Sequence, residues 1–224
     1  MPKEHTVKAF TQELDLLKSK VLEMAEECER QLAKAVHSLV ERDTKLAQDT
    51  IEGDTRINGL QGEVDELAIR MLALRQPMAL DLRHIIAAQK MAADFERIAD
   101  YAANIAKHAI ELKNGWLDKP VKSIVKMADC ALHMLNDIID AYRDLDIDKA
   151  VAVWHQDDEI DKTYFGLLTK LRTLMIEDST NVTASTRLLF VGRCCERIGD
   201  HITNVAENVH FIISGEMHHG RAIA

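Results

Sequence analysis

Glycine, proline and aromatic residues are scarce in this chain of 224 residues, which contains 9 Gly and 3 Pro and is 4% aromatic. Sheets need turn residues and aromatic or β-branched strand pairs, so this shortage argues against a β protein. Hydrophobic residues make up 47% of the chain and charged residues 29%, proportions that exclude a disordered or low-complexity polymer. The composition predicts an all-α protein that is long enough to bury a core without disulfide bonds.

Long apolar runs and excess positive charge are also lacking. No stretch reaches the roughly 18 uninterrupted apolar residues of a membrane span, and the first ten residues contain no apolar signal segment. The chain has 28 Lys and Arg against 37 Asp and Glu, giving a formal net charge of −9, the wrong sign for binding phosphate backbones. We therefore expect a cytoplasmic protein that does not bind nucleic acid.

The four cysteines, Cys28, Cys130, Cys194 and Cys195, follow no metal-binding pattern. They contain no CxxC spacing, and neighbouring residues on a helix point about 100° apart, which makes the adjacent pair a poor joint ligand. Reduced thiols packed in the core are the preferred interpretation.

Helix-breaking residues recur at intervals of about 30 residues and divide the chain into six helical segments. The three prolines, at positions 2, 77 and 120, all lie at such boundaries, where a helix tolerates them. The predicted boundaries are Asp43-Thr44, Gln76-Pro77, Asn114-Gly115 through Lys119-Pro120, Asp146 to Asp148, Ser179 to Asn181, and Ser214-Gly215.

Apolar stripes with helical spacing mark the third and sixth segments. The connections are short, so neighbouring helices must run antiparallel and form bundles. The stripes comprise Met91, Phe95, Ile98, Ala102, Ile105 and Ala109 in one segment, and Leu188, Val191, Cys195, Ile198, Ile202, Val205 and Val209 in the other.

An internal repeat is the strongest feature of the sequence. Residues 96–105 read ERIADYAANI and residues 196–205 read ERIGDHITNV, an offset of 100 residues. Upstream the offset becomes 103, where Asp54, Ile57 and Asn58 match Asp157, Ile160 and Asp161. The chain is best described as two copies of a three-helix unit, residues 1–116 and 117–224, related by a pseudo-twofold axis.

Each copy carries an oxygen-rich strip on its third helix. Glu96, Asp100 and Asn104 are four residues apart and share one helix face, and Glu196, Asp200 and Asn204 repeat the pattern. The strip points away from the apolar stripe, so we expect it to be accessible. An acidic face is usually just solvated, but a solvated face does not require the same residues in both copies.

Carboxylate and amide oxygens favour a hard cation, so Mg²⁺, Mn²⁺, Ca²⁺ or iron fits this strip better than zinc. Further acids on the second helix of each copy could add ligands or could serve as helix caps, and the sequence does not separate these two roles. These second-tier candidates are Asp54, Asp157 and Asp161. Arg97 and Arg197 could orient the carboxylates or be solvated.

The paired ERI-small-D-x-x-x-N motifs, together with Arg75-Gln76-Pro77-Met78-Ala79 and Asp81-Leu82-Arg83, resemble the PhoU family of phosphate-uptake regulators over essentially the whole chain. The resemblance implies two three-helix bundles and a surface metal site at each ExxxD motif. The implied ligands are Glu96 and Asp100 in one site and Glu196 and Asp200 in the other, supported by Asn104 and Asn204. The motif Pro-x-Ala-x-Asp-Leu-Arg has no clean counterpart in residues 176–183.

By the same resemblance, the protein is a cytoplasmic negative regulator of the phosphate-starvation response and not an enzyme. Its implied partners are the ATPase subunit of the phosphate ABC transporter, a phosphate-sensing histidine kinase and a second copy of itself. It would reach the membrane only through these partners.

Two other classes compete with this interpretation. A ferritin-like di-iron enzyme needs two Glu-x-x-His pairs, and only Glu207 and His210 have this spacing. A helical adaptor without metal is the second alternative. His218 and His219 lie in a Gly-containing tail and are not expected to be ligands. His201 is not expected to be a ligand either, because Tyr101 occupies its place in the first copy.

Overall fold

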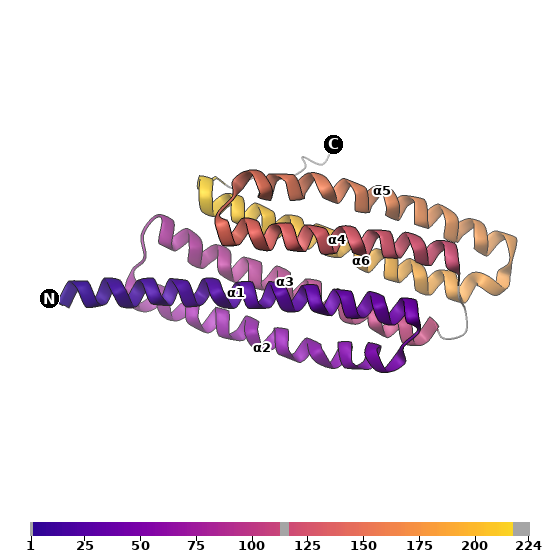
Figure 1. The fold of residues 1–224 in the computed structure, drawn as a ribbon, viewed down its shortest axis with the longest axis horizontal. Coiled ribbons are helices and arrows are strands. Elements are labelled where there is room, and N and C mark those ends of the chain that lie inside the picture. The colour runs from indigo at the N-terminus through magenta and orange to yellow at the C-terminus, as the bar shows by residue number, and fades with distance from the viewer. Residues whose placement is uncertain (1, 113–116, 217–224) are drawn as a thin grey trace.

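The computed structural model describes residues 2–112 and 117–216, with side chains from residue 9 onward. Within these residues the chain forms helices and short connections (Figure 1). The predicted all-α class and the six long helices are confirmed. The helices are α1 (Pro2–Glu41), α2 (Thr44–Arg75), α3 (Leu80–Glu111), α4 (Asp118–Asp144), α5 (Ile147–Glu177) and α6 (Val182–Ser214), with a short 3₁₀ turn η2 (Ser179–Asn181) before α6.

Side-chain caps explain where two of the helices begin. The carboxylate of Asp43 accepts hydrogen bonds from the backbone amides at the start of α2, and Asp146 does the same for α5. Gly215, with a φ of 79°, ends α6 in the left-handed conformation that glycine adopts without strain. The boundary predicted at Asn114-Gly115 and the end of the first copy at residue 116 lie outside the described residues.

The six helices form two antiparallel three-helix bundles that lie side by side along their length (Figure 1). The first contains α1, α2 and α3, and the second contains α4, α5 and α6. The bundles meet where α3 packs against α6 and α1 packs against α4, whereas α2 and α5 lie on opposite outer edges. This arrangement agrees with the predicted pseudo-twofold repeat.

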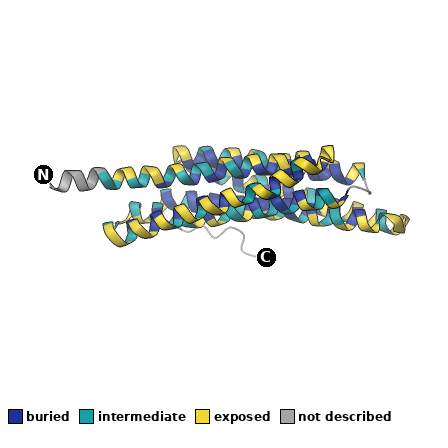
Figure 2. Cartoon of the chain, turned by 90° about the horizontal axis from the view of Figure 1, so that it is seen from below, coloured by how far each residue is buried: buried dark blue, intermediate teal, exposed yellow. Residues whose placement is uncertain are grey.

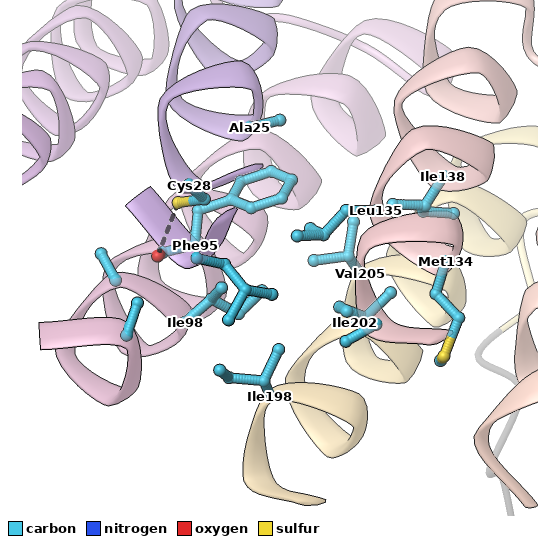
Figure 3. Packing of buried hydrophobic residues seen from close by; sticks show 14 of the residues in the cluster. Ala25, Cys28, Phe95, Ile98, Met134, Leu135, Ile138, Ile198, Ile202 and Val205 are labelled. Atoms are coloured by element: carbon cyan, nitrogen blue, oxygen red, sulfur yellow. Dashed lines mark hydrogen bonds between the residues drawn. The ribbon is translucent and has the colours of Figure 1, made fainter. Parts of the chain in front are cut away.

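The core continues from one bundle into the other. Buried residues concentrate between the helices while the outer faces are exposed (Figure 2). Figure 3 shows Phe95 and Ile98 of α3 facing apolar side chains of α4 and α6, so the predicted stripes supply this core. The thiol of Cys28 donates a hydrogen bond to the carbonyl oxygen of Phe95, at 3.0 Å.

The free cysteines partly match the expectation of core thiols. Cys28, Cys194 and Cys195 are buried, whereas Cys130 is half-buried on α4. In the described part of the chain, no helix combines the length and the apolar character needed to cross a bilayer.

Polar contacts fix how the bundles are aligned. Glu111 pairs with Arg187 at 2.7 Å, and Asp94 contacts His201 at 2.9 Å, so residue numbers rise on α3 as they fall on α6. The two central helices therefore run antiparallel. On the other side, the ammonium of Lys18 on α1 donates to the carbonyl oxygen of Arg143 at the end of α4, at 2.7 Å.

Candidate metal centres in the two repeats

The first oxygen-rich strip lies beside α2. The side chain of Asp100 is 37% exposed, but that of Glu96 is only 19% exposed. Asp54 of α2 lies near both carboxylates: its charge raises the pKa of Glu96, and the charge of Asp100 raises the pKa of Asp54. The strip thus lies beside the contact between α2 and α3, and its glutamate is more covered than the sequence predicts, because the packing of α2 against α3 is a tertiary property.

The two additional candidate acids that occupy equivalent positions in the repeats, Asp54 and Asp157, are not helix caps. Asp54 and Asp157 each lie ten residues after the first residue of their helix, α2 and α5, which begin at Thr44 and Ile147. The caps are Asp43 and Asp146 instead. The alternative that assigned these acids to capping is therefore wrong, since a cap must lie within the first turn.

The arginine of each repeated motif orients the carboxylates. Arg97 donates to Asp100 at 2.9 Å and lies 3.4 Å from a carboxylate oxygen of Glu96. Arg197 donates to Asp200 at 3.1 Å in the same way. Both arginines thus contact the carboxylates of their motif, while their side chains, 58% and 44% exposed, are also open to solvent.

The second strip lies against α5 and repeats the first. The side chain of Asp200 is 39% exposed and that of Glu196 is 14% exposed. Asp157 of α5 is 5% exposed, and its carboxylate lies directly over Gly199, where an added Cβ atom would be 2.3 Å from Oδ1. The absence of a side chain at position 199 makes room for this carboxylate.

The two asparagines of the motif are engaged elsewhere. The ammonium of Lys107 donates to the amide oxygen of Asn104 at 3.1 Å. The amide of Asn204 donates across the bundle interface to Asp94 of α3, at 3.2 Å. The structure therefore brings the carboxylates of each repeat together and leaves the predicted amide ligands in other contacts.

Burial and mutual repulsion make both sites unfavourable for negative charge. Burial raises the pKa of Glu96, and the charge of Asp100 raises it further. Burial also raises the pKa of Asp54, again with a contribution from Asp100. In the second repeat, burial followed by the charge of Asp200 raises the pKa of Glu196.

The residues fit a hard cation in their chemistry. Among the described residues, Oδ1 of Asp54 and Oε2 of Glu196 are buried oxygens that accept no hydrogen bond. Such oxygens are costly unless a cation or proton compensates them. No three His, Cys, Asp or Glu side chains of the described segments lie close enough to form a ready-made metal site. The donors are suitable but not preassembled.

Three contacts near the sites were not anticipated. His201 faces Asp94 of the opposite bundle, with Nδ1 2.9 Å from Oδ1, and its charge acts on Glu96. Arg193 pairs with Glu196 at 2.5 Å. The third contact is the one between the ammonium of Lys107 and the amide oxygen of Asn104. A comparison of the two copies could have drawn attention to Arg193 and Lys107, because each is a charged residue whose repeat position in the other copy holds a different residue, Ala93 and Glu207 respectively.

The remaining sequence candidates differ in where the structure places them. Glu207 and His210 lie on the partly exposed surface of α6, and the bundle core that a di-iron centre would occupy is lined by apolar side chains. Asp161 of α5 acts electrostatically on Glu196, which places it near the second site. His218 and His219 lie outside the described residues.

Comparison with known proteins identifies the family. The model of the PhoU domain matches residues 21–109 and residues 124–209, so it covers most of both bundles. A Caulobacter vibrioides protein described as a phosphate-specific transport system accessory protein PhoU homolog is 42% identical over 214 residues, which cover 95% of this chain and 93% of the relative. The Escherichia coli K12 protein PhoU is 33% identical over 95% of this chain and 88% of its own length.

Solved structures agree with the sequence relatives. The crystal structure of PhoU from Pseudomonas aeruginosa superposes with a TM-score of 0.90 at 35% identity, covering 92% of this chain and all of that one (100%). The phosphate transport system regulatory protein PhoU from Streptococcus pneumoniae gives a TM-score of 0.86 at 29% identity, with 93% and 99% coverage. The fold, the two matched segments and the full-length relatives together establish that this chain belongs to the PhoU family.

Proposed function

We propose that this protein is an accessory regulator of phosphate-specific transport that restrains the phosphate-starvation response. The observation that carries the proposal is the match of the PhoU domain to both halves of the chain, supported by relatives whose names describe that role.

Its partners follow from that role. The protein acts in the cytoplasm as a homodimer and couples the ATPase subunit of the phosphate ABC transporter to a sensor histidine kinase. It reaches the membrane through these proteins. Its net charge of −9 is compatible with docking to proteins and unfavourable for direct attraction to anionic lipid.

Metal binding is the second part of the proposal. Glu96, Asp100 and Asp54 would hold a hard cation in the first repeat, and Glu196 and Asp200 would hold one in the second, together with the two acids of α5. The bound cation would supply positive charge that relieves repulsion among the carboxylates. Because the oxygens are not preassembled, each site would draw side chains from two helices when a cation binds.

Alkaline phosphatase activity in phosphate-rich medium tests the role. Deletion of the gene should raise the activity, and complementation with the wild-type chain should return it to a low level. Activity that stays low in the deletion strain would contradict the regulatory role. A variant in which the four ExxxD carboxylates are replaced by alanine then tests whether the metal sites serve this role. If metal binding matters, this variant should complement poorly and should purify with less metal.

A matched control separates the sites from general loss of negative charge. It replaces four exposed acids that belong to neither set of proposed ligands and should complement as the wild type does. If the two quadruple variants behave alike in metal content and in repression, the assigned sites are wrong and the metal-free adaptor remains. The control residues are Glu41, Asp49, Asp144 and Glu177.

A further inference from the structure

The two candidate metal sites differ in charge at equivalent positions of the repeat. Asn58 in the first copy corresponds to Asp161 in the second, and Lys107 corresponds to Glu207. Both differences make the second copy more negative. They lie among residues whose carboxylates are otherwise retained, so the repeat has kept the ligands and changed their electrostatic surroundings.

In the first site, protein groups already occupy part of the donor set. The ammonium of Lys107 lies 3.1 Å from the amide oxygen of Asn104, and its charge acts on Asp54. The amide of Asn58 donates to Oδ2 of Asp54, at 3.1 Å. One cationic and one neutral donor thus satisfy oxygens that a metal ion would otherwise coordinate.

In the second site, an acid stands where the first site has a neutral donor. Asp161 adds a like charge beside Glu196, and the carboxylate of Asp157 is held in the space over Gly199. Arg193 offsets one of these charges by pairing with Glu196. Its guanidinium side chain is 42% exposed, so water competes for this ion pair and weakens it.

Counting these groups shows the imbalance. Among the described groups named above, the first site joins Asp54, Glu96 and Asp100 to Arg97 and Lys107, with His201 also acting on Glu96. The second joins Glu196, Asp200, Asp157 and Asp161 to Arg193 and Arg197, and Glu207 stands at the repeat position of Lys107. We propose that the two halves are inequivalent cation sites: the α5–α6 site binds a divalent cation first, and Lys107 is a built-in counter-ion that weakens binding at the α2–α3 site. This inference rests on the cation binding proposed above.

Lys107 is the residue whose removal should be most informative. A unit charge acting at short range on a divalent ion at a partly exposed site changes the affinity for that ion by roughly tenfold. Substitution of Lys107 by glutamine removes this charge and leaves a side chain of similar reach. The first site should then bind a cation more tightly, whereas a merely structural lysine would leave the affinity unchanged.

Binding of Mn²⁺ to the purified full-length chain measures both sites, because the six-line electron paramagnetic resonance signal of aqueous Mn²⁺ reports the free ion. Two double variants isolate the sites: E96Q/D100N removes the first, and E196Q/D200N removes the second. K107Q is then added to the variant that retains only the first site. The matched control in the same background is K122Q, which removes an exposed lysine from the first turns of α4, in the other bundle.

The wild type should bind one Mn²⁺ more tightly than the next. This tight equivalent should persist in E96Q/D100N and disappear in E196Q/D200N. K107Q should tighten the remaining site by roughly tenfold, and K122Q should not change it. Circular dichroism and thermal melts of each variant confirm that the bundles remain folded.

Two results would overturn the inference while leaving metal binding intact. The tight equivalent could be lost in E96Q/D100N instead, or K107Q could bind no better than K122Q. If even the wild type binds no Mn²⁺ at millimolar concentration, the metal part of the proposed function fails and this inference fails with it. The phosphatase assay would still decide the regulatory role independently.

Discussion

Replacing Gly199 with alanine should destabilise the protein, although the same change normally stabilises a helix. Alanine is favoured over glycine inside a helix by about 1 kcal/mol. Here the new Cβ atom would lie 2.3 Å from Oδ1 of Asp157 and 3.1 Å from Cδ1 of Ile160. Asp157 is 5% exposed, so its carboxylate cannot simply swing into water.

The balance of these two effects sets the expected magnitude. Forcing a methyl group into a filled site costs about 1–3 kcal/mol, which exceeds the gain in helix propensity. The net loss should be about 1 kcal/mol, or about 2–4 °C in Tm for a chain of this size. Gly166 provides a matched control at an exposed position of α5, because no atom lies within 4 Å of a Cβ atom built there. Gly166→Ala should therefore raise the Tm.

A double-mutant cycle identifies the cause. In a D157A background the obstructing carboxylate is absent, so Gly199→Ala should become neutral or stabilising, with a coupling energy of about 1–3 kcal/mol. Urea unfolding followed by circular dichroism measures all four corners of the cycle. If Gly199→Ala stabilises the wild type as much as Gly166→Ala does, the close approach of Asp157 to α6 is not the constraint described above.

Two further predictions concern an ion pair and the thiols. Arg75 donates to both carboxylate oxygens of Glu13, at 2.9 and 3.1 Å, and this lowers the pKa of Glu13. The ion pair's contribution to the free energy of unfolding is complete above the ordinary pKa of 4.5 and is lost as the pH falls through the lower pKa of the folded protein. Glu13→Gln should therefore lower the Tm slightly at pH 7 and match the wild type near pH 3. An equal loss of Tm at both pH values would contradict this. Half-buried Cys130 should be the first thiol to react with an aromatic disulfide reagent, because Cys28 and Cys195 are buried and burial raises the pKa of both thiols far above the usual value for cysteine. Prompt reaction of a second thiol in the folded protein would show that the core opens.

The helices could be predicted from the sequence because their signals are local. Apolar residues at three- and four-residue spacing define the face of a helix whatever lies beside it, and Phe95 and Ile198 are buried as their stripes require. Asp43 and Asp146 also behave as local signals, since each caps the helix that immediately follows it. The duplication was visible for a similar reason: equivalent residues keep their spacing within each copy.

The contacts of the sites could not be predicted in the same way, because they depend on how helices are rotated against one another. The sequence places Glu96 and Asn104 on one face, but only the packing of α2 covers the glutamate, and only a rotamer choice pairs the asparagine with Lys107. The contact between Asp94 and His201 joins residues 107 positions apart. No spacing rule within a helix encodes such a pair.

The retention of ERI-x-D in both halves has a physical explanation that joins the fold to the sites. Ile98 and Ile198 are fully buried among side chains of both bundles (Figure 3), which fixes the rotation of α3 and α6. The arginine before each isoleucine then pairs with the aspartate three residues later, as Arg97 does with Asp100. One short helical segment therefore anchors the interface and orients the carboxylates. Because the isoleucines hold the helices in place, rotation of the helices cannot separate the carboxylates of each site to relieve their repulsion. The remaining ways to relieve it are a proton, a neighbouring cationic side chain such as Lys107, or a bound metal ion, and this is why the two copies can share the same carboxylates yet differ in how they neutralise them.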